Sequence, residues 1–257
     1  RVENLVGEVA KDMWIGTFHS ICVRILRRYI DRIGFTSSFI IFDSSDQRTL
    51  VKQCIKQLNI DDKMFTDRAV LSEISNAKNE MLEPDMYKLR TNGEIRKETV
   101  AQVYSLYQKK LRENNAIDFD DIINYTIKIL SENPDVLEYY SNKFEYVLVD
   151  EYQDTNKAQF TLISILAARH GNITVVGDND QGIYSFRGAD ITNILNFEKD
   201  FPGTKIIKLE QNYRCTQNIL DAANSVIKNN ETKYEKKLWT ENGKGEMITI
   251  YRGTDEY

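Results

Sequence analysis

The chain has 257 residues, of which 28% are charged and 41% are hydrophobic. This composition argues against a disordered chain and suits one large domain or two smaller ones. The formal net charge of −5 does not by itself indicate nucleic-acid binding, and no apolar run reaches the length of a membrane helix. Cys22, Cys54 and Cys215 form no CxxC pair, so the sequence suggests neither a disulfide framework nor a zinc site. We expect a cytoplasmic protein with no membrane partner.

The N-terminal half of the chain is predicted to be mostly helical. A short strand is expected over 14–18, and apolar residues then recur at helical spacing from about 20 to 33. Residues 46–116 are highly charged and almost continuously helical in pattern, with Asp46 and Thr66 as candidate N-caps. An all-helical stretch between strand-bearing segments predicts an inserted subdomain.

From about residue 118 the pattern alternates between strands and helices. Strands are expected at 146–150, 173–178, 205–209 and 247–251, and helices at 158–168, 191–197 and 216–229. Continuous apolar strands that alternate with helices predict an α/β fold, with a parallel sheet covered on both faces.

Two of these strands end in acidic residues, Asp150-Glu151 and Asp178. In open α/β sheets, ligands bind beyond the carboxyl ends of the strands. We expect Asp150 to hold Mg²⁺ through water, and Glu151 to activate or orient a water that attacks a γ-phosphate. The alternative is that these acids are helix caps or solvated turn residues.

The segment that follows Asp178 combines an amide, two aromatic residues and a cation. Tyr184 and Phe186 beside Arg187 suit a stacking platform for single-stranded bases, worth about 1–3 kcal/mol per base. Gln181 has the chemistry to sense a γ-phosphate or to orient a water. Alternatively, the two aromatic side chains belong to the core and Arg187 is a surface charge.

Two further segments carry candidate ligand-binding residues. Arg214 can supply positive charge to a transferring phosphoryl group, and Tyr213 can stack on a purine; a surface salt bridge to Glu210 and a core tyrosine are the alternatives. Near the N-terminus a helix begins where backbone N–H groups and hydroxyls suit phosphate oxygens. The residues at that helix start are Thr17, His19 and Ser20.

Together these segments resemble superfamily 1 DNA helicases of the UvrD/Rep/PcrA type, nearest to the PcrA-like members. The resemblance covers essentially the whole chain, and the string from Gln181 to Asp190 is its most specific part. The matching strings are Thr17–Ser20, Asp118–Asp121, Val149–Thr155, Val176–Gln181, Ile183–Asp190 and Leu209–Arg214.

The resemblance implies a RecA-like parallel sheet of the P-loop NTPase type, with ATP and Mg²⁺ as cofactors. Asp150 and Glu151 match the Mg²⁺ and catalytic carboxylates. Gln181 matches the glutamine that couples the γ-phosphate to the DNA site. Tyr213 matches an adenine-stacking aromatic residue and Arg214 an arginine finger. The implied catalytic residues are therefore Glu151, Gln181 and Arg214.

The resemblance also implies binding of single-stranded DNA and of junctions between single and double strands, with repair or replication proteins as further partners. Phe186 stands where relatives often have tryptophan, so we expect somewhat weaker stacking. The residues that match DNA contacts are Thr17, His19, Ser20, Tyr184, Phe186 and Arg187.

The domain organisation implied by the resemblance has three parts. Residues 1–45 and 117–207 would form motor domain 1A, 46–116 the helical insertion 1B, and 208–257 the start of motor domain 2A. The chain contains no G-x-x-x-x-G-K-[ST] loop to hold phosphates. We expect the parent protein to be an ATP-dependent 3′→5′ DNA helicase and translocase acting in replication and repair. The 257-residue fragment alone is expected not to hydrolyse ATP.

The residues alone leave two other functions open. Asp150, Glu151 and Asp178 could hold metal ions in a Mg²⁺-dependent nuclease. Lys157 argues against this because it lies on the expected helix after the acids and not on a neighbouring strand. The second alternative is a module that binds single-stranded DNA through the aromatic loop without turnover.

Overall fold

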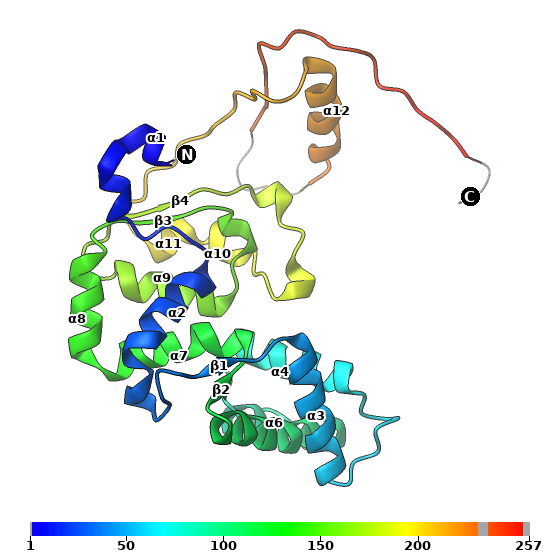
Figure 1. Ribbon diagram of the computed structural model, residues 1–257. Helices are drawn as coiled ribbons and strands as arrows, with labels where there is room; N and C mark the ends of the chain where they lie inside the picture. The colour runs from blue at the N-terminus through cyan, green and yellow to red at the C-terminus, as the bar shows by residue number, and fades with distance from the viewer. Residues whose placement is uncertain (1, 231–235, 254–257) are drawn as a thin grey trace.

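The computed structural model describes residues 2–230 and 236–253, except for the side chain of Arg187. The fold is mainly helical and contains two short parallel sheets (Figure 1). The α-helices are α1 Val2–Val6, α2 Phe18–Tyr29, α3 Ser44–Gln57, α4 Asp67–Asn79, α5 Pro84–Leu89, α6 Ile95–Glu113, α7 Phe119–Glu132, α8 Pro134–Lys143, α9 Lys157–Ala167, α10 Thr192–Leu195, α11 Phe197–Asp200 and α12 Gln217–Ile227. The strands are β1 Ile40–Ile41, β2 Ala116–Ile117, β3 Val147–Val149 and β4 Ile173–Val175.

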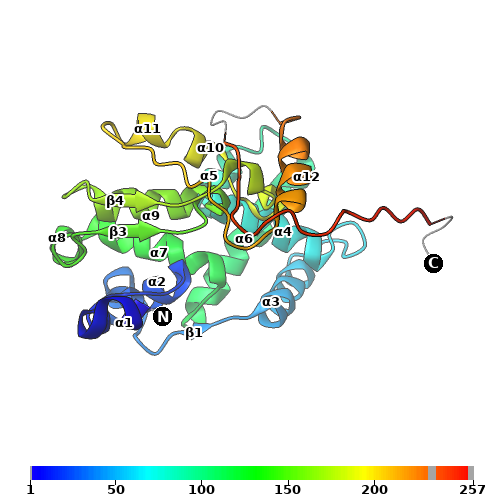
Figure 2. The same cartoon turned by 90° about the horizontal axis from the view of Figure 1, so that it is seen from above.

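Strands β3 and β4 form a parallel pair, with α9 as the connection between them. The pairing continues beyond the strands, because the N–H of Val176 donates to the carbonyl of Val149 at 2.8 Å and the N–H of Tyr152 donates to Val176 at 2.9 Å. Figure 2 shows the two strands side by side with α9 next to them. This confirms the predicted strand–helix–strand unit, and it brings the two acidic strand ends to the same edge.

One apolar core lies among α2, α7, α8 and α9. Its centre includes Ile25, Leu26, Ile129 and Tyr140, each fully buried. The start of α2 is fixed by Thr17, whose side chain accepts a hydrogen bond from the N–H of Ser20 at 3.2 Å. The core therefore holds the beginning of α2 against α7.

A second apolar core lies within the helical segment between residues 44 and 116 and is built mainly from α3, α4 and α6. Thr66 caps α4 as predicted, and its hydroxyl accepts from the N–H of Ala69 at 3.3 Å. The prediction that Asp46 caps α3 is wrong, because the N-cap is Asp43. The Asp43 carboxylate accepts from the Asp46 N–H, and Asp46 is the reciprocal residue of this capping box.

The two chain segments that enter and leave this helical part run alongside each other. Strand β1 pairs in parallel with β2, with Ile40 opposite Ala116 and Ile41 opposite Ile117. The N–H of Phe42 also donates to the carbonyl of Ile117 at 2.9 Å. The helical segment therefore begins and ends at one short sheet.

The predicted strands at 14–18, 205–209 and 247–251 are not strands in the structure. Their backbones lack a ladder partner among the described residues, and an isolated extended segment is not a stable strand. Trp14 instead packs edge-on against Phe144, with ring centroids 5.2 Å apart. The predicted helix at 191–197 is divided at Asn196 into α10 and α11.

Among the described residues after 209, several contact one another near α12. Gln211 forms a parallel β-bridge with Trp239. The N–H of Gln217, at the start of α12, donates to the carbonyl of Gly243 at 2.9 Å. Figure 1 shows α12 set apart from the helices of the first core.

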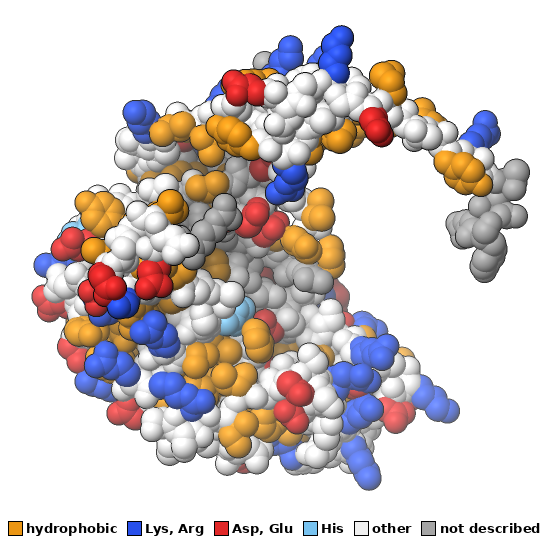
Figure 3. Space-filling model, turned by 45° about the horizontal axis from the view of Figure 1, so that its top comes forward, with side chains coloured by type: hydrophobic (Ala, Val, Ile, Leu, Met, Phe, Trp, Pro, Cys, Tyr) orange, Lys and Arg blue, Asp and Glu red, His pale blue; other side chains and the backbone are white. Residues whose placement is uncertain are grey.

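The surface seen in Figure 3 curves around an open recess, and Lys and Arg side chains are numerous toward its lower right. The molecule is therefore less uniformly acidic than its net charge of −5 suggests. Across the described ranges, no helix combines the length and apolar character needed to cross a lipid bilayer.

Candidate functional site

The acidic pair Asp150-Glu151 directly follows β3, and both residues are exposed. Glu151 has a φ of 50°, in the left-handed region that residues other than glycine adopt rarely. Its N–H donates to the Asp150 carboxylate at 3.0 Å. The chain therefore turns sharply at the strand end and presents both carboxylates at the edge of the sheet.

Gln153 joins the two acidic strand ends. This side chain is buried, and its Nε2 donates to the carboxylate of Glu151 at 2.8 Å. Its Oε1 accepts from the N–H of Asp178 at 3.0 Å. Gly177 makes this approach possible, because a Cβ there would lie 2.7 Å from Oε1 of Gln153. Sequence reasoning assigned Gln153 no role, since only the fold brings Asp178 within its reach.

Asp178 is the centre of the second acidic strand end. Its carboxylate accepts from the amide of Gln181 at 2.7 Å and pairs with Lys236, which lies beyond α12. Burial raises the pKa of Asp178, but the hydrogen bonds from Lys236 and Gln181 outweigh it and hold that pKa below its usual value. Gln181 therefore lies at the same acidic edge as Glu151.

The donor set at this edge is compatible with Mg²⁺. Within the described ranges, no group of three or more His, Cys, Asp or Glu side chains forms a metal-binding cluster. Mg²⁺ commonly binds through one or two carboxylates and keeps water or substrate phosphates as its other ligands. Asp150 and Glu151 provide carboxylates of this kind. A cage of several protein carboxylates, which a two-metal nuclease would use, is not present among the described residues.

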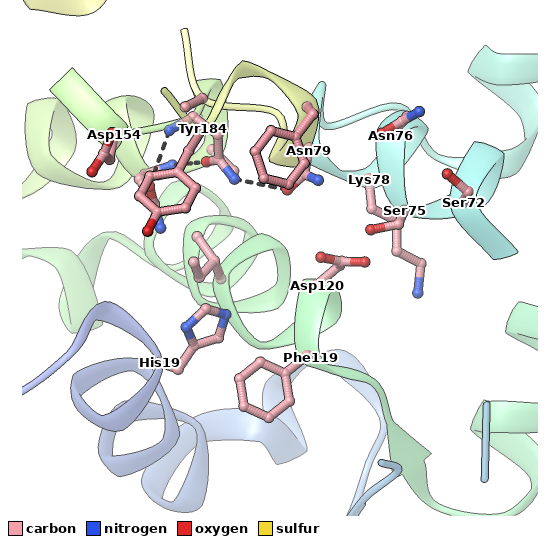
Figure 4. A pocket seen from close by; sticks show the side chains of 16 residues that line it. His19, Ser72, Ser75, Asn76, Lys78, Asn79, Phe119, Asp120, Asp154 and Tyr184 are labelled. Carbon is pink, nitrogen blue, oxygen red and sulfur yellow. Dashed lines mark hydrogen bonds between the residues drawn. The ribbon is translucent and has the colours of Figure 1, made fainter. Parts of the chain in front are cut away.

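A pocket of about 610 Å³ lies beside this edge and collects residues from distant parts of the chain. His19, Tyr184 and Phe186, three of the predicted DNA contacts, line it together. Figure 4 shows His19 and Phe119 on one side of the pocket, with Tyr184 and Asn79 on the other. Helix α4 adds a polar face that consists of Ser72, Ser75, Asn76 and Asn79.

The aromatic loop, which we define as residues 183–188, presents its rings to solvent. Phe186 is 74% exposed and Tyr184 is 37% exposed, with ring centroids 6.0 Å apart. The alternative that both are core residues is therefore wrong. Gly188 ends the turn with a φ of 83°, a conformation that favours glycine.

His19 lies on the opposite wall of the pocket. Its ring is 4.6 Å from that of Phe119, between centroids. Burial lowers the pKa of His19, against the opposing effect of a hydrogen bond with the backbone of Phe119. The hydroxyls of Thr17 and Ser20 are both used at the helix start, where Ser20 Oγ donates to the Thr17 carbonyl at 2.8 Å. Neither is among the residues that line the pocket.

Tyr213 and Arg214 lie on a separate surface. Tyr213 is 80% exposed and its hydroxyl donates to Gln211, so the core alternative is wrong. Glu210 accepts from the backbone of Lys237, and no ion pair joins it to Arg214 within residues 2–230 and 236–253. Over those same ranges, no hydrogen bond or ion pair links Tyr213 or Arg214 to the acidic edge. The structure thus brings Gln181 to Asp178, at the same edge as Glu151, but does not bring Tyr213 and Arg214 there.

A buried ionic cluster, which sequence reasoning missed, adjoins the pocket, and its lysine helps to line it. Lys78 of α4 is 1% exposed and pairs with Asp118 at 2.6 Å and Asp121 at 2.7 Å. The hydroxyl of Tyr107 in α6 also donates to Asp118 at 2.9 Å. Burial would lower the pKa of Lys78, but the two carboxylates reverse this and raise it. The sequence feature that could have indicated this cluster is a lysine at a core position of α4, beside Ala77.

Two helicase domain profiles match the sequence. The family profile of the UvrD/REP helicase N-terminal domain matches residues 1–202, and that of the UvrD-like helicase C-terminal domain matches residues 207–257. The chain is 54% identical over 257 residues to the ATP-dependent DNA helicase PcrA of Bacillus subtilis, and 52% identical over 258 residues to that of Leuconostoc citreum. All of this chain aligns, but it spans only 35% and 34% of those two relatives.

Proposed function

The chain belongs to the UvrD/REP helicase family, and from this premise we propose that the whole protein is an ATP-dependent DNA helicase and translocase. The observation that carries the proposal is the course of residues 178–188. This single segment runs from the acidic edge, where Gln181 contacts Asp178, to the pocket lined by Tyr184 and Phe186. A conformational change at the acidic edge can therefore be transmitted along this segment to the aromatic residues of the pocket.

On the nucleotide side, Glu151 acts as the general base or orients the attacking water, and Gln181 senses the γ-phosphate. Asp150 would hold Mg²⁺. When bound, Mg²⁺ neutralises charge on the phosphate oxygens. The position of Glu151, fixed by Gln153, supports this role.

The second motor domain completes the nucleotide site in this proposal. Arg214 supplies positive charge to the transferring phosphoryl group, and Tyr213 stacks on the adenine ring. Both side chains are exposed and therefore accessible to a bound nucleotide.

On the DNA side, single-stranded bases stack on Tyr184 and Phe186 and extend toward His19 across the pocket. His19 contributes a contact or a hydrogen bond from the opposite wall of the pocket. The resemblance adds Arg187, Thr17 and Ser20 as contacts. It also supports 3′→5′ movement, binding to junctions of single and double strands, and work in repair and replication beside other proteins.

We extend the proposal to the architecture. The parallel pair β3–β4 belongs to a RecA-like sheet of motor domain 1A, formed by residues 1–45 and 117–207. Residues 46–116 are the helical insertion 1B, which is supported by their separate apolar core and by the β1–β2 pair at their two ends. Residues 208–257 begin motor domain 2A.

The test is ATP hydrolysis by the full-length protein, measured with and without single-stranded DNA. We expect hydrolysis that DNA stimulates strongly in the wild type. In Phe186→Ala, the DNA concentration for half-maximal stimulation should rise while the rate at saturating DNA is retained. Hydrolysis that DNA does not change would contradict the proposal. Cleavage of DNA with Mg²⁺ and no nucleotide would favour the nuclease instead.

A further inference from the structure

The last residue of α4, Asn79, contacts two segments that each contribute residues to the pocket. Its Oδ1 accepts a hydrogen bond from Nδ2 of Asn156 at 2.7 Å. Its amide group also lies against Gly188, where an added Cβ would be 3.3 Å from Nδ2 of Asn79. Figure 4 shows Asn79 on the same side of the pocket as Tyr184. One side chain of the helical segment therefore meets two parts of the site.

Both contacts lead to the proposed machinery. Asn156 is the N-cap of α9 and accepts from the N–H of Gln159 at 2.9 Å, only five residues after Glu151. Gly188 closes the turn that carries Phe186. Asn79 thus lies between the segment after the acidic pair and the aromatic loop.

The end of α4 is itself firmly held. The neighbouring residue Lys78 is buried between Asp118 and Asp121, and its carbonyl accepts from Asn124 of α7 at 2.8 Å. Breaking such a buried ionic cluster is strongly unfavourable. The position of Asn79 is therefore fixed relative to α7, and Asn79 can act as a rigid support for the loop.

We propose that Asn79 is a positioning residue that holds the aromatic loop in its base-binding conformation, so that the helical segment sets the affinity for single-stranded DNA. This inference rests on the proposed function. The support is partial, because the loop is also held by the N–H of Asp190, which donates to the carbonyl of Thr155 at 2.9 Å. Loss of Asn79 should therefore weaken DNA binding without abolishing it.

The experiment compares Asn79→Ala with wild type in the full-length protein, using a dT oligonucleotide. Loss of one hydrogen bond corresponds to roughly a two- to tenfold change in an equilibrium constant. We expect oligonucleotide affinity to fall by this factor, and the DNA concentration for half-maximal ATPase stimulation to rise equally. The ATPase rate at saturating DNA should be unchanged. The matched control is Asn114→Ala, at the C-terminal end of α6, whose amide donates to Lys110 alone among the described residues.

A double-mutant cycle separates positioning from general destabilisation. If Asn79 and Asn156 act through their shared hydrogen bond, the effects of Asn79→Ala and Asn156→Ala on DNA affinity will be less than additive. Additive effects, or an Asn79→Ala protein with wild-type DNA affinity, would overturn the inference. The inference would also be overturned if Asn79→Ala lowered the melting temperature and the ATPase rate but left the half-saturating DNA concentration unchanged. If the wild type binds no single-stranded DNA, the proposed function itself fails. That outcome is distinguishable from failure of the Asn79 inference, in which the wild type still binds DNA.

Discussion

The side-chain amide of Gln153 donates a 2.8 Å hydrogen bond to the carboxylate of Glu151. The other end of the amide accepts from the backbone of Asp178, so its orientation is fixed at both ends. A general base must be held within hydrogen-bonding reach of the water it activates. The hydrogen bond from Gln153 would hold Glu151 in place for the proposed role of general base.

The first prediction concerns Glu151. In the full-length protein, Glu151→Gln should lower kcat for ATP hydrolysis by about 10²–10⁴-fold, the usual contribution of a general base. Binding of ATP should persist, because the amide keeps the shape of the side chain. Glu145→Gln, an exposed residue just before β3, is the control and should leave kcat unchanged. A Glu151→Gln protein with wild-type kcat would exclude Glu151 as the base.

The second prediction concerns the aromatic loop. Phe186→Ala should weaken binding of single-stranded DNA by about 1–3 kcal/mol, the contribution of one stacked base. Its free energy of unfolding should scarcely change, because the ring is 74% exposed. Fluorescence anisotropy with a labelled oligonucleotide gives the affinity, and urea unfolding gives the stability. Ile183→Ala, which removes a 68% exposed apolar side chain from the same loop, should bind DNA normally. Equal losses in the two variants would argue against stacking.

The third prediction concerns the buried ionic cluster. Lys78→Met should destabilise the protein by about 3–5 kcal/mol, because it leaves two carboxylates buried without their partner. Combining it with Asp118→Asn and Asp121→Asn should recover much of this loss. Urea unfolding measures both variants, with Lys109→Met on the exposed side of α6 as the control. A Lys78→Met protein as stable as that control would show that the cluster does not hold α4 to α7.

The fourth prediction concerns pH. Burial, together with the charge of Asp118, raises the pKa of Asp120 to about 6. Above that pH, the folded state carries an ionised Asp120 that its surroundings destabilise, so folding is less stable than it would be without this charge. Between about pH 4 and 6, the folded state binds more protons than the unfolded state, and the penalty falls as the pH falls. Asp120→Asn should therefore be more stable than wild type in mildly alkaline buffer, with a gain that shrinks on acidification. Unfolding curves across this range test it, with Asp85→Asn on exposed α5 as the control. A constant difference between wild type and Asp120→Asn would contradict it.

The sequence predicts well those features that depend on local pattern. The parallel pair that ends in Asp150 and Asp178 follows from apolar runs that each finish with an acid. The exposed aromatic loop follows from its unusual combination of residues. Thr66 as an N-cap depends only on its neighbours along the chain, and it is confirmed.

The features that could not be predicted depend on contacts between distant segments. Gln153 is one of several polar residues in its string, and only the fold places Asp178 against it. Lys78 resembles any charged residue of α4 until Asp118 and Asp121 are brought beside it. The segment 205–209 has the composition of a strand, but a strand also requires a neighbour with which to pair.

The most direct test of the central claim is strand separation by the full-length protein on a duplex with a single-stranded tail. We predict ATP-dependent unwinding when the tail is at the 3′ end, little when it is at the 5′ end, and none in Glu151→Gln. The 257-residue chain, which contains no phosphate-binding loop, should not hydrolyse ATP under the same conditions. Unwinding that proceeds without ATP, or that survives Glu151→Gln unchanged, would contradict the account.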